Sequence, residues 1–440
     1  MTFKSGAPLL LLVCGVWACG ASSSSSGGET GSGSGGARPS ESGGAPGSGG
    51  LTGSGGRPGS GGVTAIASGG ATASGSGGLT GSGGATSSGG TTSSSGGAAG
   101  GLGGTTGTGP GTGTGNPAVC TFASGLNVAW VQFAGDIPNP NLATFNTIFK
   151  NTHDAGGRVV RWWFHTNGTI TPGYDASGMT VKIPQTHIDG IKSILSAANA
   201  NGVAIDLSLW SFDMLQANAG DAYVNNQKLI EVDANRQAYI DNYLTPLVTA
   251  LKGLPGLYSY EIFNEPEGMS ASGWATHRTT QAFINRTVNW LAAAIHDADP
   301  TALVTNGSQT FDYCSNVAGK INNYSDASLR SAGGKMNGTL DFYEVHYYMI
   351  NGISNSAFKN PASYWGLDKK LVMGEFYALP TDGTAAADIY TYLYSNGYNG
   401  AWAWNYTTDD MAGTTTKWPT MQVPIQNLYN AHMQQVGSCP

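Results

Sequence analysis

The sequence has little charge, few cysteines and no hydrophobic run long enough to cross a membrane. Its longest apolar run near the N-terminus, residues 9–18, is shorter than the roughly 20 residues that a membrane-spanning helix needs. The run follows Lys4 and precedes small residues, which is the pattern of a secretory signal. We therefore expect residues 1–19 to be a signal peptide and the protein to be exported, either secreted outside the cell or held at the outer-membrane surface.

The residues around Cys19 bear on how the protein is held after export. Val16-Trp-Ala-Cys-Gly20 resembles the cleavage site of bacterial lipoproteins, in which the cysteine is lipidated and becomes the mature N-terminus. The resemblance implies a lipid on Cys19. Trp17 is not the usual residue at its position, so secretion without a lipid stays open. The lipid is the membrane contact that we expect.

The scarcity of basic residues and of cysteine argues against two classes of partner. Charged residues make up 11% of the chain, the net charge is −7, and the basic residues are scattered, whereas nucleic-acid-binding proteins carry a basic stripe. The 5 cysteines show no metal-site spacing, so we expect neither a metal nor an organic cofactor. Export permits a disulfide, and we favour pairing Cys120 with Cys439, which flank the folded part, leaving Cys314 free.

Aromatic residues are missing from residues 20–116, which consist almost entirely of glycine, serine, threonine and alanine. Such a segment cannot bury a core and behaves as a flexible coil with an r.m.s. span of roughly 50–60 Å. We expect a disordered, low-complexity tether. All 11 tryptophans except Trp17 lie in residues 117–440, which we expect to form one monomeric domain.

Along residues 117–440, strand-like runs of β-branched and aromatic residues alternate with helix-like runs. This alternation favours a parallel sheet covered by helices. An open sheet would need a glycine-rich phosphate loop after its first strand, and Trp130-Val-Gln-Phe-Ala134 is not one. We therefore expect a (β/α)₈ TIM barrel, with helices near residues 142–152, 188–198, 236–251 and 279–297, and strands at residues 125–132, 158–164, 203–210, 257–265, 302–306, 340–348, 370–375 and 400–404.

Polar and aromatic residues gather at the ends of these strands, where TIM barrels carry their active sites. Asn264 and Glu265 end the fourth strand, and Pro266 favours extended backbone at Glu265. Glu375 ends the seventh strand. Two carboxyl groups among aromatics suggest a sugar site, because retaining glycoside hydrolysis uses an acid and a carboxylate roughly 5–5.5 Å apart. The other strand-end candidates are Arg161, Trp163, His165, Trp210, His346, Tyr348 and Trp404.

The arrangement resembles that of clan A glycoside hydrolases, whose pattern has Asn-Glu-Pro at the end of strand four and a second glutamate at the end of strand seven. The resemblance covers residues 117–440. It implies that Glu265 is the acid/base, that Glu375 is the nucleophile, and that Asn264 binds the sugar 2-hydroxyl. Arg161 matches the arginine of strand two, whose positive charge would favour the ionised form of Glu375.

Further site residues follow from a resemblance to family five within that clan. His346-Tyr347-Tyr348 resembles its His-x-Tyr motif, which implies that Tyr348 hydrogen-bonds the nucleophile and that His346 lines the site. Trp404 corresponds to the tryptophan under the reacting sugar. Because sugar rings present apolar faces to flat side chains, Trp210 and Trp163 are also candidates for substrate contact.

The residues at the end of the third strand bear on which polysaccharide is the substrate. Many family-five cellulases end it with a histidine, whereas this chain has Leu209-Trp-Ser-Phe-Asp213. That segment and the segments Arg-Trp-Trp-Phe-His and Asn-Glu-Pro-Glu-Gly-Met resemble segments of bacterial proteins called mannanase-like. We expect a retaining endo-β-1,4-mannanase acting on plant polysaccharide. A β-1,4-glucanase and a non-catalytic carbohydrate-binding surface protein are the alternatives.

Several ionisable residues have a structural interpretation. Asp206, Glu261 and Glu344 lie inside strands, and buried carboxylates need partners, so Arg161 could serve structure alone. By strand alternation, Glu261 and Glu344 share the sides of Glu265 and His346 but lie deeper, and we expect them to support the site. His165 could line the site or cap a loop.

Overall fold

The computed structural model describes residues 120–407 and 416–438. The expected signal peptide, the lipidation site Cys19, the tether and Cys439 lie outside the described residues. Cys120 is disulfide-bonded. Cys314 is free and buried, as predicted. Within the described ranges, no helix has the length and apolarity needed to cross a membrane.

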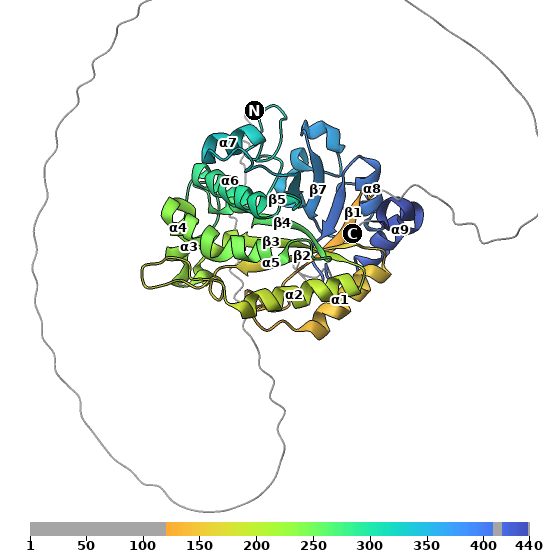
Figure 1. Cartoon of the computed structure of the whole chain (residues 1–440). Coiled ribbons are helices and arrows are strands. Elements are labelled where there is room, and N and C mark those ends of the chain that lie inside the picture. Colours follow the sequence, from red (N-terminus) through yellow and green to blue (C-terminus); the bar gives the residue numbers. More distant parts are fainter. Residues whose placement is uncertain (1–119, 408–415, 439–440) are drawn as a thin grey trace, which may run out of the picture. The chain divides into compact units, whose positions relative to one another are not determined.

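Eight parallel strands of the described chain close into a barrel in sequence order, which confirms the predicted TIM barrel (Figure 1). Each strand pairs with its neighbour in sequence, and β1 pairs with β8. The strands are β1 (Ala123–Ala129), β2 (Val159–Thr166), β3 (Ala204–Ser211), β4 (Leu257–Asn264), β5 (Val304–Ser308), β6 (Phe342–His346), β7 (Lys370–Glu375) and β8 (Gly400–Ala403).

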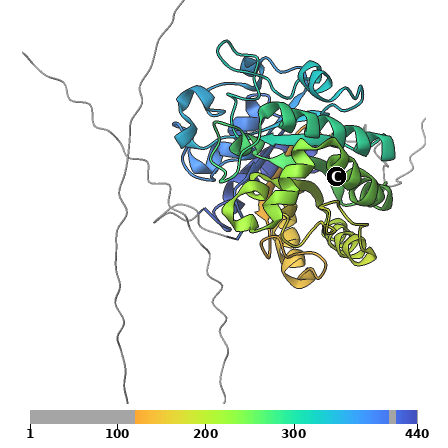
Figure 2. The same cartoon turned by 90° about the vertical axis from the view of Figure 1, so that its left-hand side faces the viewer.

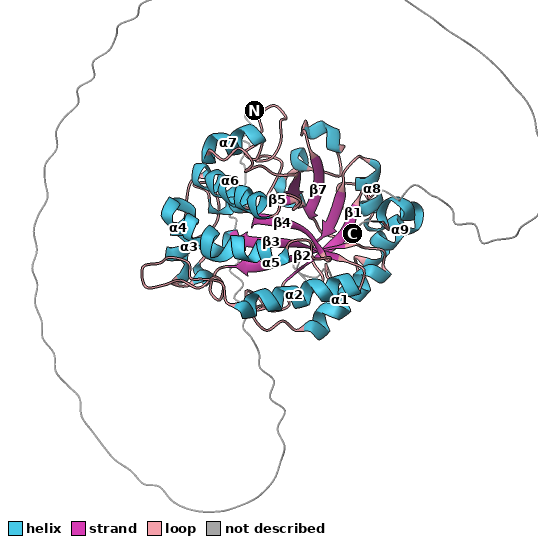
Figure 3. Cartoon of the chain, in the orientation of Figure 1, coloured by secondary structure: helices cyan, strands magenta, loops and turns pink. Residues whose placement is uncertain are grey.

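Helices surround the barrel on its outside (Figures 2 and 3). Three lie where the apolar spacing predicts them: α1 (Leu142–Asp154), α2 (Gln185–Ala200) and α6 (Gln281–Ala298). The sequence pattern did not identify α3 (Ala222–Glu231), α7 (Asp326–Gly333), α8 (Ile389–Ser395) or α9 (Gln422–Val436).

The helix expected at residues 236–251 is interrupted. It consists of α4 (Asp233–Tyr239), a π-helical turn (Ile240–Leu244) and α5 (Thr245–Leu251). Pro246 lies in the first turn of α5 and has no N–H to offer the carbonyl one turn earlier. That carbonyl, Asn242 O, instead accepts the N–H of Ile183 at 2.9 Å. The proline therefore explains the change of helical pitch.

Inside the barrel, an apolar layer lies below a polar one. We call the lower layer the apolar floor; it consists of Ala123, Val159, Phe342, Val372 and Trp402, all buried. Two residues further along β2 and β6, the inner face carries Arg161 and Glu344 instead. The larger hydrophobic cluster, which includes Leu207, Ile262 and Leu291, packs strands against helices. The apolar floor therefore fills the lower part of the barrel, and the polar side chains lie closer to the carboxyl ends of the strands.

Candidate active site

Glu265 follows directly on β4, at the carboxyl end of the barrel, and its backbone is left-handed rather than extended, with φ of +44° and ψ of 53°. The expectation drawn from Pro266 is therefore wrong at this residue. A left-handed conformation costs a non-glycine residue about 1–2 kcal/mol. The Glu265 N–H donates to Gly307 O of β5 at 2.8 Å, which holds this turn against the next strand.

The turn after Glu265 is anchored by a second glutamate. Pro266 begins a short 3-10 helix (Pro266–Met269). Within it, the buried Glu267 carboxylate accepts hydrogen bonds from Ser308 Oγ at 2.9 Å and from Tyr324 Oη at 2.5 Å. These bonds fix the segment that carries Glu265 to β5 and to the loop that follows it.

Arg161 of β2 is the centre of the polar layer. Its Nη1 donates to Glu375 Oε1 at 2.6 Å and to Asn127 Oδ1 at 2.8 Å. Its Nη2 donates to Asn264 Oδ1 at 2.8 Å and to Glu261 Oε1 at 2.7 Å. The guanidinium therefore links the ends of β4 and β7, and its contact with Glu375 agrees with the sequence prediction. Asn127 is a member of this layer that the sequence did not single out.

Glu375 is buried at the end of β7 and is held from two sides. Besides Arg161, Tyr348 Oη donates to Glu375 Oε2 at 2.7 Å, the contact expected from the His-x-Tyr motif. Burial raises the pKa of Glu375 to about 7, and Arg161 and the Tyr348 hydroxyl counteract that rise. The two donors therefore favour the ionised form that a nucleophile requires.

His346 lies between the two strand-end glutamates. Its Nδ1 is 3.0 Å from Glu265 Oε1 and 3.6 Å from Glu375 Oε2. One atom of each of these three residues lies within 4.8 Å of the others. The separation of the carboxyl groups therefore suits retention, since inverting enzymes hold theirs about 6.5–9.5 Å apart.

The protonation of the two glutamates differs. Burial raises the pKa of Glu265 well above its usual value, and the negative charge of Glu375 raises it further. Glu375 has the arginine and the tyrosine to stabilise its charge, whereas Glu265 has His346, whose own pKa is lowered by burial and by Arg161. A pair of carboxyl groups with separated pKa values can supply an acid and a nucleophile.

Three tryptophans form an aromatic cluster at the ends of β1, β2 and β8. The Trp163 ring is 5.4 Å from that of Trp404 and 5.3 Å from that of Trp130, which lies just after β1. The Arg161 guanidinium lies 5.5 Å from the Trp163 ring centroid. Trp404 and Trp130 are partly exposed, whereas 5% of Trp163 is accessible. Trp130 and Trp404 therefore offer the accessible ring surface of this cluster.

Comparison with known proteins identifies the family of this chain. A sequence profile described as Cellulase (glycosyl hydrolase family 5) matches residues 120–410. The chain belongs to glycosyl hydrolase family 5. It is 35% identical to the mannan endo-1,4-beta-mannosidase of Mytilus edulis, over 65% of this chain and 84% of that protein. The family 5 protein is therefore a glycoside hydrolase.

Solved structures of two mannanases are similar to this chain in fold and in sequence. The X-ray structure of the beta-mannanase from Mytilus edulis has 32% sequence identity and a TM-score of 0.63, covering 70% of this chain and 91% of that one. The beta-1,4-D-mannanase from Cryptopygus antarcticus has 31% identity and a TM-score of 0.64, with coverage of 70% and 90%. Both similarities cover more than two thirds of the family 5 protein.

Two strand-end candidates of the family 5 protein do not join the group around Glu265 and Glu375. Trp210 is 1% exposed, and its ring packs on His165 and on Tyr239 of α4, with centroids 4.5 and 5.8 Å away. A buried ring offers no face to a sugar, so substrate contact by Trp210 is not supported. His165 is also buried, with ring nitrogens 2.8 Å from Thr171 Oγ1 and 3.0 Å from Tyr239 Oη. Its role is structural.

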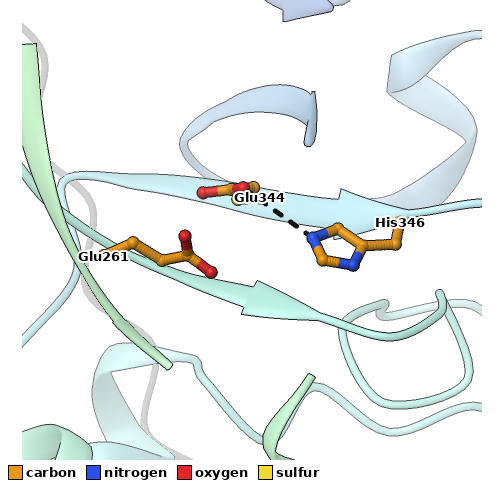
Figure 4. A group of neighbouring side chains, drawn as sticks. All are labelled: Glu261, Glu344 and His346. Carbon is orange, nitrogen blue, oxygen red and sulfur yellow. Dashed lines mark ion pairs between the residues drawn. The ribbon is translucent and has the colours of Figure 1, made fainter. Parts of the chain in front are cut away.

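Sequence reasoning missed Trp130 although a signal was available. Trp130 lies near the end of the first strand-like run, residues 125–132, so the rule that strand ends carry the site applies to it as it does to Trp404. The expected supports, Glu261 and Glu344, are buried beside Arg161, with Nη2 to Glu261 Oε1 at 2.7 Å and Nε to Glu344 Oε1 at 3.0 Å. Figure 4 shows both with His346.

Proposed function

We propose that this glycoside hydrolase is a retaining endo-β-1,4-mannanase. Three observations support the proposal: the short separation of Glu265 and Glu375, the split in their protonation, and the 35% identity to a mannan endo-1,4-beta-mannosidase over 84% of that relative. The separation of the two carboxyl groups is the observation that supports a retaining mechanism, because it leaves no room for a water molecule between the nucleophile and the sugar.

In the proposed reaction, Glu265 protonates the glycosidic oxygen while Glu375 attacks the anomeric carbon, and the sugar chain beyond the bond departs. A covalent glycosyl-enzyme remains on Glu375. Glu265, now ionised, removes a proton from water, and the water oxygen replaces Glu375 at the anomeric carbon. Two inversions give net retention.

Neighbouring residues have supporting roles in this proposal. Arg161 and Tyr348 stabilise the Glu375 carboxylate before attack, and Asn264, held by Arg161, faces the sugar 2-hydroxyl. Trp404 supplies a flat apolar surface under the reacting sugar, flanked by Trp163. Because a polysaccharide is too large to enter a cell, we also propose that the protein acts after export, either secreted or anchored by a lipid on Cys19.

A β-1,4-glucanase is the second candidate, because the matching family profile carries the description Cellulase. Release of reducing ends from galactomannan, glucomannan, carboxymethylcellulose and xylan separates the two. We expect the highest rate on the mannans. Faster hydrolysis of carboxymethylcellulose would favour the glucanase.

Two controls test the mechanism apart from the substrate. Glu375→Ala should abolish release of reducing ends from every glycan that the wild type cleaves. An NMR time course of the products should show the retained anomer first. Wild-type rates in the alanine variant, or first appearance of the inverted anomer, would contradict the assignment of Glu375 as the nucleophile.

A further inference from the structure

A buried group of carboxyls lies directly beneath the candidate catalytic residues. Arg161 Nε donates to Glu261 Oε2 at 2.7 Å and lies 3.0 Å from Glu344 Oε1 and 3.9 Å from Asp206 Oδ2. With Glu375, four carboxyl groups share one guanidinium. One positive charge cannot neutralise four buried negative charges, and an unpaired buried charge is costly. At least one of the four carboxyl groups must therefore be protonated.

A metal ion is a poor alternative source of positive charge here, although Glu261, Glu344 and His346 each place one ligand atom within 4.8 Å of the others. The backbone packs directly on the carboxyls. A Cβ on Gly307 would lie 2.3 Å from Glu261 Oε1, and one on Gly374 would lie 2.2 Å from Glu344 Oε1. The Arg161 guanidinium already lies where a cation would bind.

Glu344 is the group best suited to hold a proton. Glu261 accepts two N–H groups of Arg161, an arrangement typical of a carboxylate. Neither oxygen of Glu344 accepts a hydrogen bond within the described part of the chain, since Arg161 Nε, 3.0 Å from Oε1, donates to Glu261. Burial raises the pKa of Glu344 well above its usual value, and the nearby acids raise it further. The ionisable groups that face Glu344 are Arg161 of β2, Asp206 of β3, Tyr258 and Glu261 of β4, His346 of β6 and Glu375 of β7.

His346 connects this group to the acid/base. Its Nδ1 is 3.0 Å from Glu265 Oε1, and its Nε2, which has no hydrogen-bond partner among the described residues, is 3.8 Å from Glu344 Oε1 (Figure 4). Burial and Arg161 keep the imidazole neutral by lowering its pKa, so one ring nitrogen carries the proton. If that nitrogen is Nδ1, it donates to Glu265 Oε1 and leaves the Glu265 proton on the other oxygen, available to the substrate.

We propose that Glu344 is a positioning residue that, as a neutral acid facing Nε2, fixes the Nδ1–H tautomer of His346 and so directs the Glu265 proton toward the substrate. The inference rests on the proposed acid/base role of Glu265. An ionised Glu344 would attract an N–H to Nε2 instead. Nδ1 would then accept the Glu265 proton, and that proton would point away from the glycosidic oxygen. The imidazole carries one proton in either case.

The tautomer can be measured without any substrate. The full chain, labelled with nitrogen-15 in its 7 histidines, is suited to NMR, and a His346 variant assigns the resonance. We expect the wild type to be protonated on Nδ1 near neutral pH. Glu344→Gln should keep this tautomer because the amide N–H can face Nε2, whereas Glu344→Ala should lose it. Asp221→Asn, which alters an exposed carboxyl just before α3 and none of the four around Arg161, should leave it unchanged.

Kinetics supply the second readout. Glu344→Ala should lower kcat by roughly tenfold or more, within the range of general acid catalysis, and Glu344→Gln should recover most of that loss. A wild-type His346 protonated on Nε2, or equal losses in the two variants, would overturn the proposal. If Glu344→Ala fails to fold, the wild-type and Glu344→Gln spectra still decide. The spectra also stand if no glycan is cleaved, so failure of the proposed function is distinguished from failure of this inference.

Discussion

At the scale of single residues, the hydroxyl of Tyr348 offers a test of the charge on Glu375, because one atom can be removed without opening the core. A hydrogen bond to a charged group contributes about 1.5–3 kcal/mol. Without its donation at 2.7 Å, the pKa of Glu375 rises and less of the nucleophile is ionised. We expect Tyr348→Phe to move the acidic limb of the kcat/KM profile to higher pH, with a loss of tenfold or more at low pH. An unchanged limb would show that Arg161 alone sets the charge.

Glu265 should reduce the stability of the fold while serving catalysis. Its pKa is raised in the folded protein, so its contribution to stability is present below the ordinary pKa of an unfolded glutamate and is lost as pH rises through the folded value. We expect Glu265→Gln to raise Tm near pH 8 by 2 °C or more, roughly the effect of 1 kcal/mol, and to leave Tm near pH 4 unchanged. Thermal melts at both pH values measure the difference, and Asp221→Asn, at an exposed carboxyl just before α3, is the surface control.

The site residues that could be predicted from the sequence lie on a regular strand, as Arg161 and Glu375 do, or belong to a recognised motif, as Tyr348 does. Arg161, Glu375 and Tyr348 have the contacts expected of them. Near their carboxyl ends the strands lose strict alternation: Glu261 and Asn264 of β4, three residues apart, both contact Arg161. The pairing of β2 with β3 also shifts between Trp163 and Thr166. Alternation therefore could not give the directions of His165 and Trp210.

At the scale of elements, β7 shows how closely the strand is fitted to the buried acids. Gly374 precedes Glu375, and a Cβ there would lie 2.2 Å from Glu344 Oε1. We expect Gly374→Ala to displace Glu375 and Glu344, lowering kcat by tenfold or more and stability by about 1–3 kcal/mol, as overpacking does. Gly135→Ala is the matched control, because its Cβ would meet its nearest atom at 3.6 Å. Equal effects of the two substitutions would refute the steric argument.

Element types were easier to predict than element ends. Runs of β-branched and aromatic residues located all eight strands, but β6 stops at His346, two residues before the expected end. The reason is local: Tyr348 N donates to Asn351 Oδ1 at 2.7 Å and the chain enters a 3-10 turn. Likewise, the interruption of the helix expected at residues 236–251 is accompanied by a hydrogen bond from Ile183 N–H to Asn242 O, and these two residues are distant in sequence. Such contacts are invisible to a pattern of apolar residues.

At the scale of the whole barrel, the two ends of the described fold meet beside Cys120, which is disulfide-bonded. Thr121 N donates to Gln435 O of α9 at 3.2 Å. A loop-closing disulfide typically contributes 2–4 kcal/mol. We expect Cys120→Ser to lower Tm by several degrees and to leave kcat and KM unchanged at temperatures well below the transition. A loss of activity at low temperature would mean that the bond also shapes the site.

The fold itself followed from the sequence because the signal is repeated. Eight strand-like runs separated by helical segments leave few topologies open, and an error at any one boundary does not change the answer. The left-handed backbone of Glu265 is a single feature with no such repetition, and the pattern of residues did not predict it.

The apolar floor has a consequence for the order of events in a catalytic cycle. Trp402, Phe342 and Val372 are buried in the lower part of the barrel, so we expect solvent to reach Glu375 from the opposite end, where the sugar chain would lie. The water that ends the cycle must therefore enter by the route through which the first product leaves. We expect departure of that product to precede hydrolysis. A hydroxyl group of a sugar that remains in the exit route should then compete with water for the glycosyl-enzyme. Transfer of the glycosyl group to added mannobiose, rising with its concentration, would reveal this competition.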